Sequence, residues 1–456
     1  MEKPPPLPDT VIKLPIFSPN EIKHFRFTPE QYIHLEMEYN RYIIYKEWVK
    51  SIENLFKLHT SEQNNTTRKI YENKNIIDRF VLECINHGIS PHSIVKSKGT
   101  LESIESLEPI APIAPIAPIA PIEPVDMEQN RRYLFFNKDL SNEAVMKETP
   151  YFKKMISEYI EKKFRYTPDK LAQLLKILSN ANYKYMKTVQ ELHSNRNKLG
   201  YFSDISCSLL VNDSENYIIR YRGYTKVINF KRYAKLIRNY DRPFPFDIVR
   251  VLLRYSIFDM SNQQWSIGIN LYDEISNQLD IGFEMFASPL NFNMNMFCSL
   301  FLDTDKTFGS VGSFYNITVD KLLNLGLRGV FYNPPYLPLL MDTTTRMCIN
   351  LLNKMHELGI NFTIVSFLPN WIDADYIQAF LASRYTVFHQ VIPKGQYVLH
   401  EKDRGKLIRG TFDLLFVVMN SRRAEWDDSK KSGVLEVCRN IIETMKRELL
   451  EKNIDK

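Results

Sequence analysis

The second half of the chain alternates short apolar runs with longer amphipathic segments. Between residues 245 and 420 the runs are "DIGFEMF", "LRGVFY", "NFTIVSFL", "TVFHQVI" and "FDLLFVVMN". Apolar runs of this length, separated by helical patterns, predict an α/β domain with a largely parallel sheet. Ligands of such a domain bind at the carboxyl ends of its strands, so the segments that follow these runs form the candidate site.

Helical and short β patterns occupy the rest of the chain. Thr28, Pro29 and Gln31 supply the cap, first-turn proline and returning side chain of a helix start, and apolar residues then recur at helical spacing to Phe56. We expect this face to pack within a small helical module; a surface for a protein partner is the alternative. Residues 140–200 also predict helices, residues 203–230 predict short strands, and the last segment predicts an amphipathic helix on the core.

A proline repeat divides the chain. Residues 101–125 carry proline at every third position from Pro109 to Pro124, which favours a polyproline II spacer over a ligand for a proline-binding domain. We therefore expect five regions. They are an N-terminal helical module (1–100), an Ala-Pro-Ile linker (101–125), a helical domain with a basic β-hairpin (126–244), an α/β core (245–425) and a C-terminal amphipathic helix (426–456).

Composition narrows the class of protein without naming a function. The 456 residues carry a formal charge of +6, which permits nucleic-acid binding without requiring it. The five cysteines stand singly and no C-x-x-C or His/Cys cluster appears, so we expect reduced thiols and no metal site. No segment predicts a signal peptide or membrane span, and the expected location is the cytoplasm or the nucleus.

Three segments that follow predicted strands bear the candidate chemistry. They are "FEMFASPLN" (283–291), "FLDTDKTFGSVGSF" (301–314) and "NPPY" (333–336). The third is suited to methylation of an adenine amine, a poor nucleophile that must be held by acceptors in line with the methyl donor. Asn333 offers a side-chain carbonyl, Pro334 a backbone carbonyl fixed in direction, and Tyr336 a ring on which a base can stack. The alternative is a turn that ends a strand; the position behind two other strand-end segments favours a site.

The same segments resemble a known family. "FASPLN", "FCSLFLDTDKTFGSVGSF" and "NPPY", together with "FLPNW" (367–371) and "VIPKGQYVLHEKDRG…FDLLFVVMN" (391–420), are similar to the core of the phosphorylated-CTD-interacting-factor family, the cap-specific adenosine N6-methyltransferases. The resemblance covers roughly residues 130–420. The paired-tryptophan pattern of a WW domain, which animal members carry, is absent from the sequence.

The resemblance implies a fold, a reaction and a set of residues. The fold would be a Rossmann-like S-adenosylmethionine-dependent methyltransferase domain (245–425) preceded by a mainly helical domain. The reaction would be N6-methylation of the 2′-O-methyladenosine that begins 7-methylguanosine-capped mRNA, with S-adenosyl-L-methionine as cofactor. The catalytic motif would be Asn333, Pro334, Pro335 and Tyr336, with Tyr336 where the family often has phenylalanine. The residues expected in segments lining the cofactor pocket are Phe286, Ser288, Asn291, Asp303, Asp305 and Phe308.

The role of Asp303 and Asp305 has two possible interpretations. Pairing of Asp303 or Asp305 with the ribose hydroxyls of the cofactor is the specific proposal, and capping of the loop is the alternative.

A basic cluster interleaved with aromatic residues is the candidate RNA contact. Residues 220–242 hold eight basic side chains and one acid, Asp241, and their tyrosines and Phe230 could stack bases. A solvated charged face is the alternative. The RNA-binding candidates are Arg220, Arg222, Lys226, Lys231, Arg232 and Lys235.

Two other functions remain open from the sequence. The same chemistry could act on internal RNA adenine or on DNA adenine, and a catalytically inactive scaffold could keep the fold and bind capped RNA.

Overall fold

The computed structural model describes residues 22–25, 29–60, 207–211, 216–238, 246–256, 265–336, 338–401 and 406–451, with a few positions between 184 and 195. The linker at 101–125 and almost all of the helices predicted over 140–200 lie outside the described residues.

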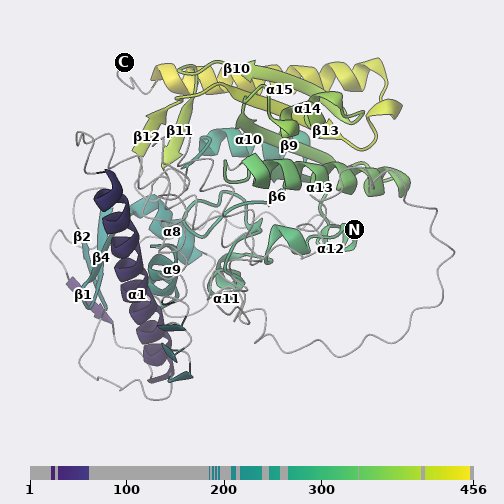
Figure 1. Cartoon of the computed structure of the whole chain (residues 1–456). Helices are drawn as coiled ribbons and strands as arrows, with labels where there is room; N and C mark the ends of the chain where they lie inside the picture. Colours follow the sequence, from purple (N-terminus) through teal and green to yellow (C-terminus); the bar gives the residue numbers. More distant parts are fainter. Residues whose placement is uncertain are drawn as a thin grey trace, which may run out of the picture.

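A six-stranded sheet forms the centre of the α/β part (Figure 1). Its strands, in their order across the sheet, are β7 (Met296–Phe297), β6 (Phe283–Glu284), β8 (Gly329–Tyr332), β9 (Thr363–Pro369), β13 (Leu414–Asn420) and β10 (Thr386–Ile392). The first four are mutually parallel, and β13 is antiparallel to both of its neighbours. The largely parallel sheet predicted from the apolar runs is confirmed, with β13 as its one reversed strand.

The strand order reverses beside β6. The chain passes from β6 to β7 on one side and then crosses back to β8 on the other side of β6. In an open α/β sheet such a reversal leaves a crevice at the carboxyl ends of the two strands that diverge. The carboxyl ends of β6 and β8 meet at this point.

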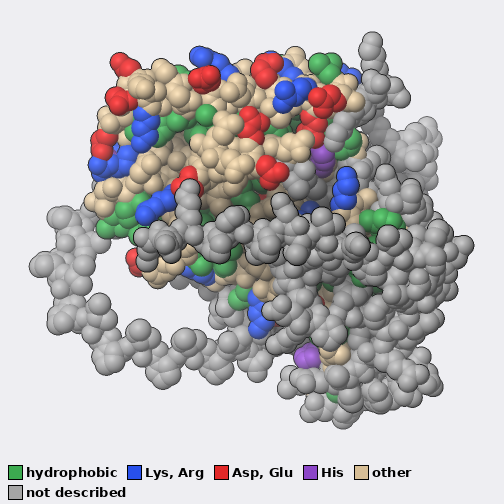
Figure 2. All heavy atoms as spheres, turned by 180° about the vertical axis from the view of Figure 1, so that it is seen from behind, with side chains coloured by type: hydrophobic (Ala, Val, Ile, Leu, Met, Phe, Trp, Pro, Cys, Tyr) green, Lys and Arg blue, Asp and Glu red, His purple; other side chains and the backbone are tan. Residues whose placement is uncertain are grey.

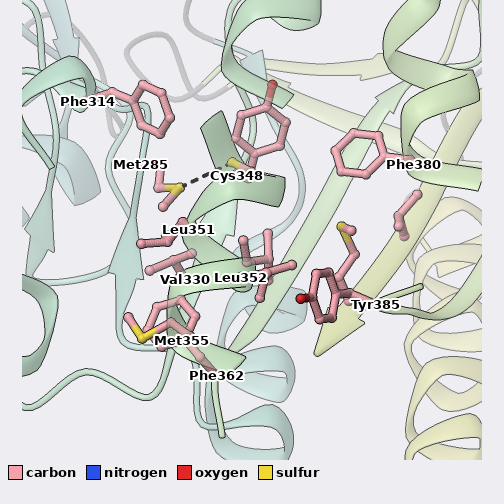
Figure 3. Packing of buried hydrophobic residues seen from close by; sticks show 14 of the residues in the cluster. Met285, Phe314, Val330, Cys348, Leu351, Leu352, Met355, Phe362, Phe380 and Tyr385 are labelled. Atoms are coloured by element: carbon pink, nitrogen blue, oxygen red, sulfur yellow. Dashed lines mark hydrogen bonds between the residues drawn. The ribbon is translucent and has the colours of Figure 1, made fainter. Parts of the chain in front are cut away.

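Helices cover both faces of the sheet, which explains why its strands are apolar on both sides. One face packs against α10 (Ile269–Leu279) and α15 (Asp428–Glu451), and the other against α12 (Val319–Asn324), α13 (Pro338–Glu357) and α14 (Asp375–Ala382). Successive residues of β8 and β9 alternate between the two cores: Val330 and Ile364 face one, Phe331 and Val365 the other. Figure 3 shows the core on the side of α12, α13 and α14, which contains Val330. There the Cys348 thiol lies 3.9 Å from the Met285 sulfur.

The predicted C-terminal helix is α15, and its apolar stripe is buried. Cys438, Ile441 and Met445 are at most 1% exposed and pack with α10 and the sheet.

A second, antiparallel sheet contains the predicted β-hairpin. It consists of β1 (Ile22–Phe25), β2 (Cys207–Val211), β3 (Asn216–Tyr221) and β4 (Tyr224–Asn229), followed by α8 (Phe230–Arg238) and α9 (Phe246–Tyr255). The N-terminal helix α1 (Pro29–Thr60) begins at Pro29 as predicted and contacts α9. β1 and α1 therefore pack with β2 and α9, although the two pairs of elements are far apart in sequence.

A small third sheet lies between these parts. It joins β12 (Lys406–Arg409), β11 (Val398–Glu401) and β5 (Trp265–Ser266) in antiparallel order. Among the described residues, no helix combines the length and apolar character that crossing a membrane requires.

Candidate active site

Three loops meet at the carboxyl edge of β6, β7 and β8. Backbone hydrogen bonds join them: Met285 N–H donates to the Phe331 carbonyl (2.8 Å), and Ala287 N–H to the Cys298 carbonyl (2.9 Å). Beyond β7, Ser299 N–H donates to the Gly312 carbonyl (2.9 Å). The three sequence segments singled out as candidate chemistry therefore lie side by side, at the point where the strand order reverses.

The Asn-Pro-Pro-Tyr segment begins directly after β8. Pro334 is buried, whereas Asn333, Pro335 and Tyr336 are half-buried. The Tyr336 hydroxyl donates to the Asn333 side-chain carbonyl at 3.3 Å, and the Tyr336 ring meets Phe412 edge-on with 5.6 Å between ring centres. Burial raises the pKa of Tyr336 well above that of a free tyrosine, so the hydroxyl stays protonated at neutral pH.

The loop after β6 is closed by its own polar side chains. The Asn291 side-chain carbonyl accepts from the Ser288 backbone N–H (2.7 Å) and hydroxyl (3.0 Å), which makes a tight turn. Phe286, from the same loop, is half-buried and packs 4.7 Å from Phe314 and 5.7 Å from Tyr332. Ser288 and Asn291 thus shape the loop, while the Phe286 ring lies between it and the end of β8.

Glu284, the acidic residue of the first candidate segment, was given no role from the sequence, and Asn293 was not singled out at all. The Glu284 carboxylate is buried at the end of β6 and accepts from the backbone N–H groups of Asn293 (2.7 Å) and Met294 (3.0 Å). Burial raises the pKa of Glu284. The side-chain carbonyl of Asn293 is buried and has no hydrogen-bond partner among the described residues. The sequence signal for Glu284 is that it is the one acidic residue in the first candidate segment.

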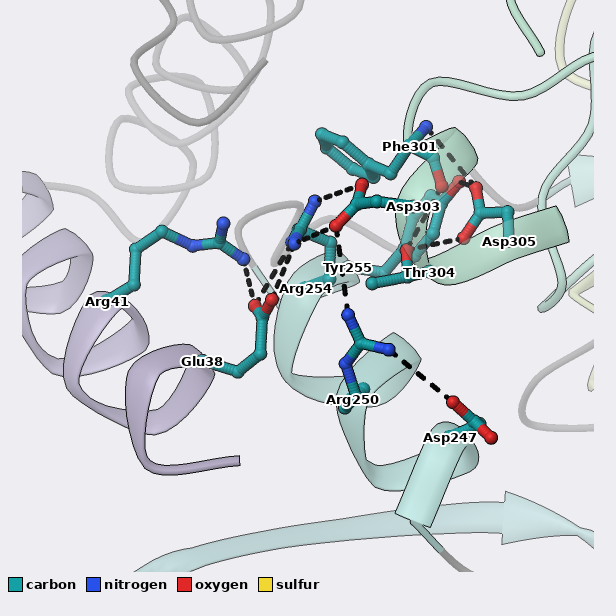
Figure 4. A network of polar contacts seen from close by, with 10 residues as sticks. All are labelled: Glu38, Arg41, Asp247, Arg250, Arg254, Tyr255, Phe301, Asp303, Thr304 and Asp305. Carbon is teal, nitrogen blue, oxygen red and sulfur yellow. Dashed lines mark hydrogen bonds and ion pairs between the residues drawn. The ribbon is translucent and has the colours of Figure 1, made fainter. Parts of the chain in front are cut away.

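Asp303 and Asp305 are bound by side chains from α9 (Figure 4). The Arg254 guanidinium donates to both Asp303 oxygens, at 3.0 and 2.8 Å. Asp305 is fully buried and accepts from the Tyr255 hydroxyl (2.6 Å) and the Thr304 hydroxyl (2.8 Å). These contacts favour the loop-holding interpretation of the two aspartates over pairing with ribose.

Further contacts fix the same loop. Phe308 is 1% exposed, so its ring belongs to the packing beneath the loop. Gly309 has φ 101°, and a Cβ there would lie 2.2 Å from the Asn295 carbonyl oxygen, so only glycine allows this close approach.

The six basic candidates for RNA contact divide into three groups. Arg220 and Lys231 are exposed, and Lys226 is half-buried. Arg222 pairs with Glu36 of α1. Arg232 and Lys235 of α8 donate to the backbone carbonyls of Phe292 (3.0 Å) and Asn293 (2.5 Å). The last two therefore brace the loop after β6.

Three of the tyrosines interleaved with these basic residues are core residues, and Tyr240 lies outside the described residues. Tyr221, Tyr224 and Tyr233 are at most 4% exposed, and the Tyr221 hydroxyl donates to Glu36 (2.7 Å). They offer no surface on which a base could stack.

Within the described part of the chain, no group of His, Cys, Asp and Glu could hold a metal ion. Figure 2 shows acidic and basic side chains intermingled on the described part of the face seen from behind.

Comparison with known proteins places this arrangement in a family. Residues 226–402 match the family described as "Phosphorylated CTD interacting factor 1 WW domain". Over 169 residues the chain is 30% identical to a Mus musculus protein and 29% identical to a Homo sapiens protein, both named "mRNA (2'-O-methyladenosine-N(6)-)-methyltransferase". Residues 226–402 are therefore similar to the phosphorylated-CTD-interacting-factor family. The resemblance seen in the sequence is confirmed for this segment.

The alignment with the two relatives covers only part of each protein. The aligned part is 34% of this chain, 22% of the mouse protein and 23% of the human protein. The chain therefore matches less than a quarter of either relative's length.

The matched segment contains the whole candidate site. It runs from β4 into the loop after β11 and includes β6, β7 and β8 with the loops that follow them. Although the description of the phosphorylated-CTD-interacting-factor family mentions a WW domain, the matched residues here form most of the α/β part. Their two tryptophans, Trp265 on β5 and Trp371 after β9, lie in different elements.

Proposed function

We propose that this chain methylates N6 of the adenosine next to the cap of mRNA, the activity that the names of the mouse and human relatives describe. One observation carries the proposal. The Asn333-Pro334-Pro335-Tyr336 segment directly follows β8, beside the reversal of strand order. It lies within the residues that match the family.

The sheet supports a Rossmann-like methyltransferase domain. The order β7-β6-β8-β9 corresponds to the order 2-1-4-5 within a doubly wound sheet, whose ligands bind at the switch between its first and fourth strands. Here β6 and β8 hold those two places, and β13 enters between β9 and β10 as a reversed strand. A mainly helical domain ahead of this one remains part of the proposal.

The residues at the switch fit S-adenosylmethionine as the cofactor. When bound, this cofactor would supply an electrophilic methyl group to the target nitrogen. The sulfonium sulfur would keep the electron pair of the broken bond, and the methylated amine would release one proton to water. The chain offers an aromatic ring, Phe286, and an unpartnered buried acceptor, the Asn293 side-chain carbonyl, for a base and for a hydroxyl or amino group. The loop of Asp303 and Asp305 would hold the pocket's shape through Arg254 and Tyr255.

The tetrapeptide would hold the adenine amine. The Asn333 side-chain carbonyl and the Pro334 backbone carbonyl would each accept one amine N–H, which favours a pyramidal nitrogen whose lone pair points at the methyl group. Pro334 and Pro335 fix the backbone torsions on which the direction of these acceptors depends. The Tyr336 ring would stack on the base, an interaction worth about 1 to 3 kcal/mol for bases on aromatic side chains.

Methyl transfer to defined RNAs tests the proposal. Purified full-length protein is incubated with labelled S-adenosylmethionine and with capped A-starting, uncapped A-starting or capped G-starting RNA. We expect label in the capped A-starting RNA only. Equal labelling of capped and uncapped A-starting RNA would reject the cap assignment in favour of internal adenine. No labelling of these RNAs, or of adenine-containing DNA added in a parallel reaction, would reject the enzymatic function in favour of a binding scaffold.

A further inference from the structure

The motif contains an internal hydrogen bond that a phenylalanine could not make. The Tyr336 hydroxyl lies 3.3 Å from Asn333 Oδ1 and donates to it. Its partner is the same oxygen that the proposed function assigns to the adenine amine. An sp² carbonyl oxygen has two lone pairs, so one acceptor can serve both the tyrosine and the substrate.

The orientation of the Asn333 amide decides whether it can receive the amine. A half-turn about its last torsion angle would exchange the carbonyl oxygen for the NH₂ group, and two N–H donors would then face each other across the site. Nothing in the carbon skeleton of asparagine distinguishes these two orientations, because the two ends of the amide have almost the same shape. A neighbouring donor of fixed position is needed to select the carbonyl.

Tyr336 is such a donor because its ring is held in place. It packs edge-on against Phe412, at an interplanar angle of 87°, and belongs to the periphery of the core beneath α13. Two prolines separate it from Asn333 and restrict the backbone between them. The raised pKa of the phenol keeps the proton that this hydrogen bond requires over the whole neutral range.

We propose that Tyr336 is a positioning residue whose hydroxyl holds the Asn333 amide with its carbonyl oxygen toward the target amine, and this inference rests on the proposed function. Tyr336 then has two separable tasks. The ring binds the base, and the hydroxyl orders the acceptor.

A double-mutant cycle separates these tasks. Tyr336→Phe keeps the ring and removes the donor, so we expect kcat to fall about tenfold while KM for RNA and for S-adenosylmethionine stays within twofold. Tyr336→Ala removes the ring as well and should also raise KM for RNA. In Asn333→Asp the two carboxylate oxygens are equivalent and need no orientation, so this variant should keep measurable activity and adding Tyr336→Phe to it should change kcat less than twofold.

A matched control exists elsewhere in the fold. The Tyr385 hydroxyl donates to the Asn353 side-chain carbonyl at 2.7 Å, far from the tetrapeptide, so Tyr385→Phe removes the same kind of hydrogen bond and should leave kcat unchanged. Thermal unfolding of each variant verifies that it is folded.

Each outcome bears on the inference. Wild-type kcat in Tyr336→Phe would overturn the inference and leave the proposed function standing. An equal fall in the Asn333→Asp background would overturn it too, because the hydroxyl would then act on something other than the amide. An inactive Asn333→Asp variant would contradict the acceptor role of Asn333, and an inactive wild type would reject the proposed function together with the inference.

Discussion

Asp305 is the clearest case of a single residue whose surroundings change its chemistry. It is fully buried, and burial raises its pKa to about 6 even though Tyr255, Thr304 and Ser299 donate hydrogen bonds to it. In an unfolded chain the pKa of aspartate is about 3.9. The native state therefore binds the proton more tightly than the unfolded state between these pH values, and the stability from this group is lost as pH rises through about 6.

Asp305→Asn should reveal this titration. The amide cannot ionise, so the free energy of unfolding of the variant, relative to wild type, should rise by up to about 3 kcal/mol between pH 4 and pH 7, because a shift of about two pKa units is worth that much. Urea unfolding at both pH values measures it. A difference that does not change with pH would show that Asp305 has an ordinary pKa.

At this scale the sequence allowed a chemical interpretation of residues that are consecutive in the chain. It did not show which residues folding brings into contact. Asn333, Pro334 and Tyr336 could be interpreted from their chemistry because they are consecutive. Arg254 and Tyr255, which bind Asp303 and Asp305, lie on α9, about 50 residues earlier in the chain, and no local pattern links them. For the same reason the sequence could not show that Arg232 and Lys235 bind backbone carbonyls.

Helix α1 is joined to the site by buried charges. Arg254 of α9 bonds both Glu38 of α1 and Asp303 beside the site, and Arg41 bonds Glu38 from the other side (Figure 4). Burial alone would raise the pKa of Glu38, but the two guanidinium groups lower it overall, so it stays ionised. A helix outside the family-matched residues thus supports the loop after β7.

Glu38→Ala should therefore destabilise the protein strongly. The substitution leaves two buried guanidinium groups without their shared carboxylate, and breaking a buried ion pair in this way costs about 3 to 5 kcal/mol. Glu436→Ala on the exposed side of α15 is the matched control and should cost at most about 0.5 kcal/mol. Denaturant unfolding compares the two; equal small losses would mean that the network contributes little.

At the scale of elements, apolar runs predicted β6, β8, β9, β10 and β13 of the central sheet, and helical spacing predicted α1 and α15. The sequence patterns missed β1, β5, β7, β11 and β12, which are two to four residues long. Strands this short carry too little pattern to be recognised, and they exist because partner strands supply their hydrogen bonds. The reversed direction of β13 was also not predictable, since strand direction leaves no mark in composition.

At the scale of the whole molecule, only some of the six basic candidates are available for RNA. Arg222, Arg232 and Lys235 bind other parts of the protein. Arg220 and Lys231 are exposed and lie outside that set, so they are the better candidates for phosphate contacts. Composition alone could not separate these roles, because each depends on which elements pack together.

The double variant Arg220→Gln/Lys231→Gln tests this assignment. Each lost phosphate contact should reduce the slope of log K against log[salt] by roughly 0.7 to 0.9, so the pair should reduce it by about 1.4 to 1.8. Arg439→Gln/Lys446→Gln on α15 changes the net charge equally and should leave the slope unaltered. Binding of fluorescent capped RNA over a salt series measures both; equal slopes for the two variants would place the RNA elsewhere.

We propose that the chain methylates N6 of a cap-adjacent adenosine, with Asn333 as an acceptor for the amine. Nuclease digestion of product RNA, followed by mass spectrometry of the cap-containing nucleotides, tests it for transcripts that begin with adenosine, 2′-O-methyladenosine or guanosine. With wild-type protein we expect one added methyl group on the adenine base next to the cap and none on the guanosine transcript. With Asn333→Ala we expect none on any transcript. A methyl group on internal adenosines or on ribose, or undiminished methylation by Asn333→Ala, would contradict the proposal.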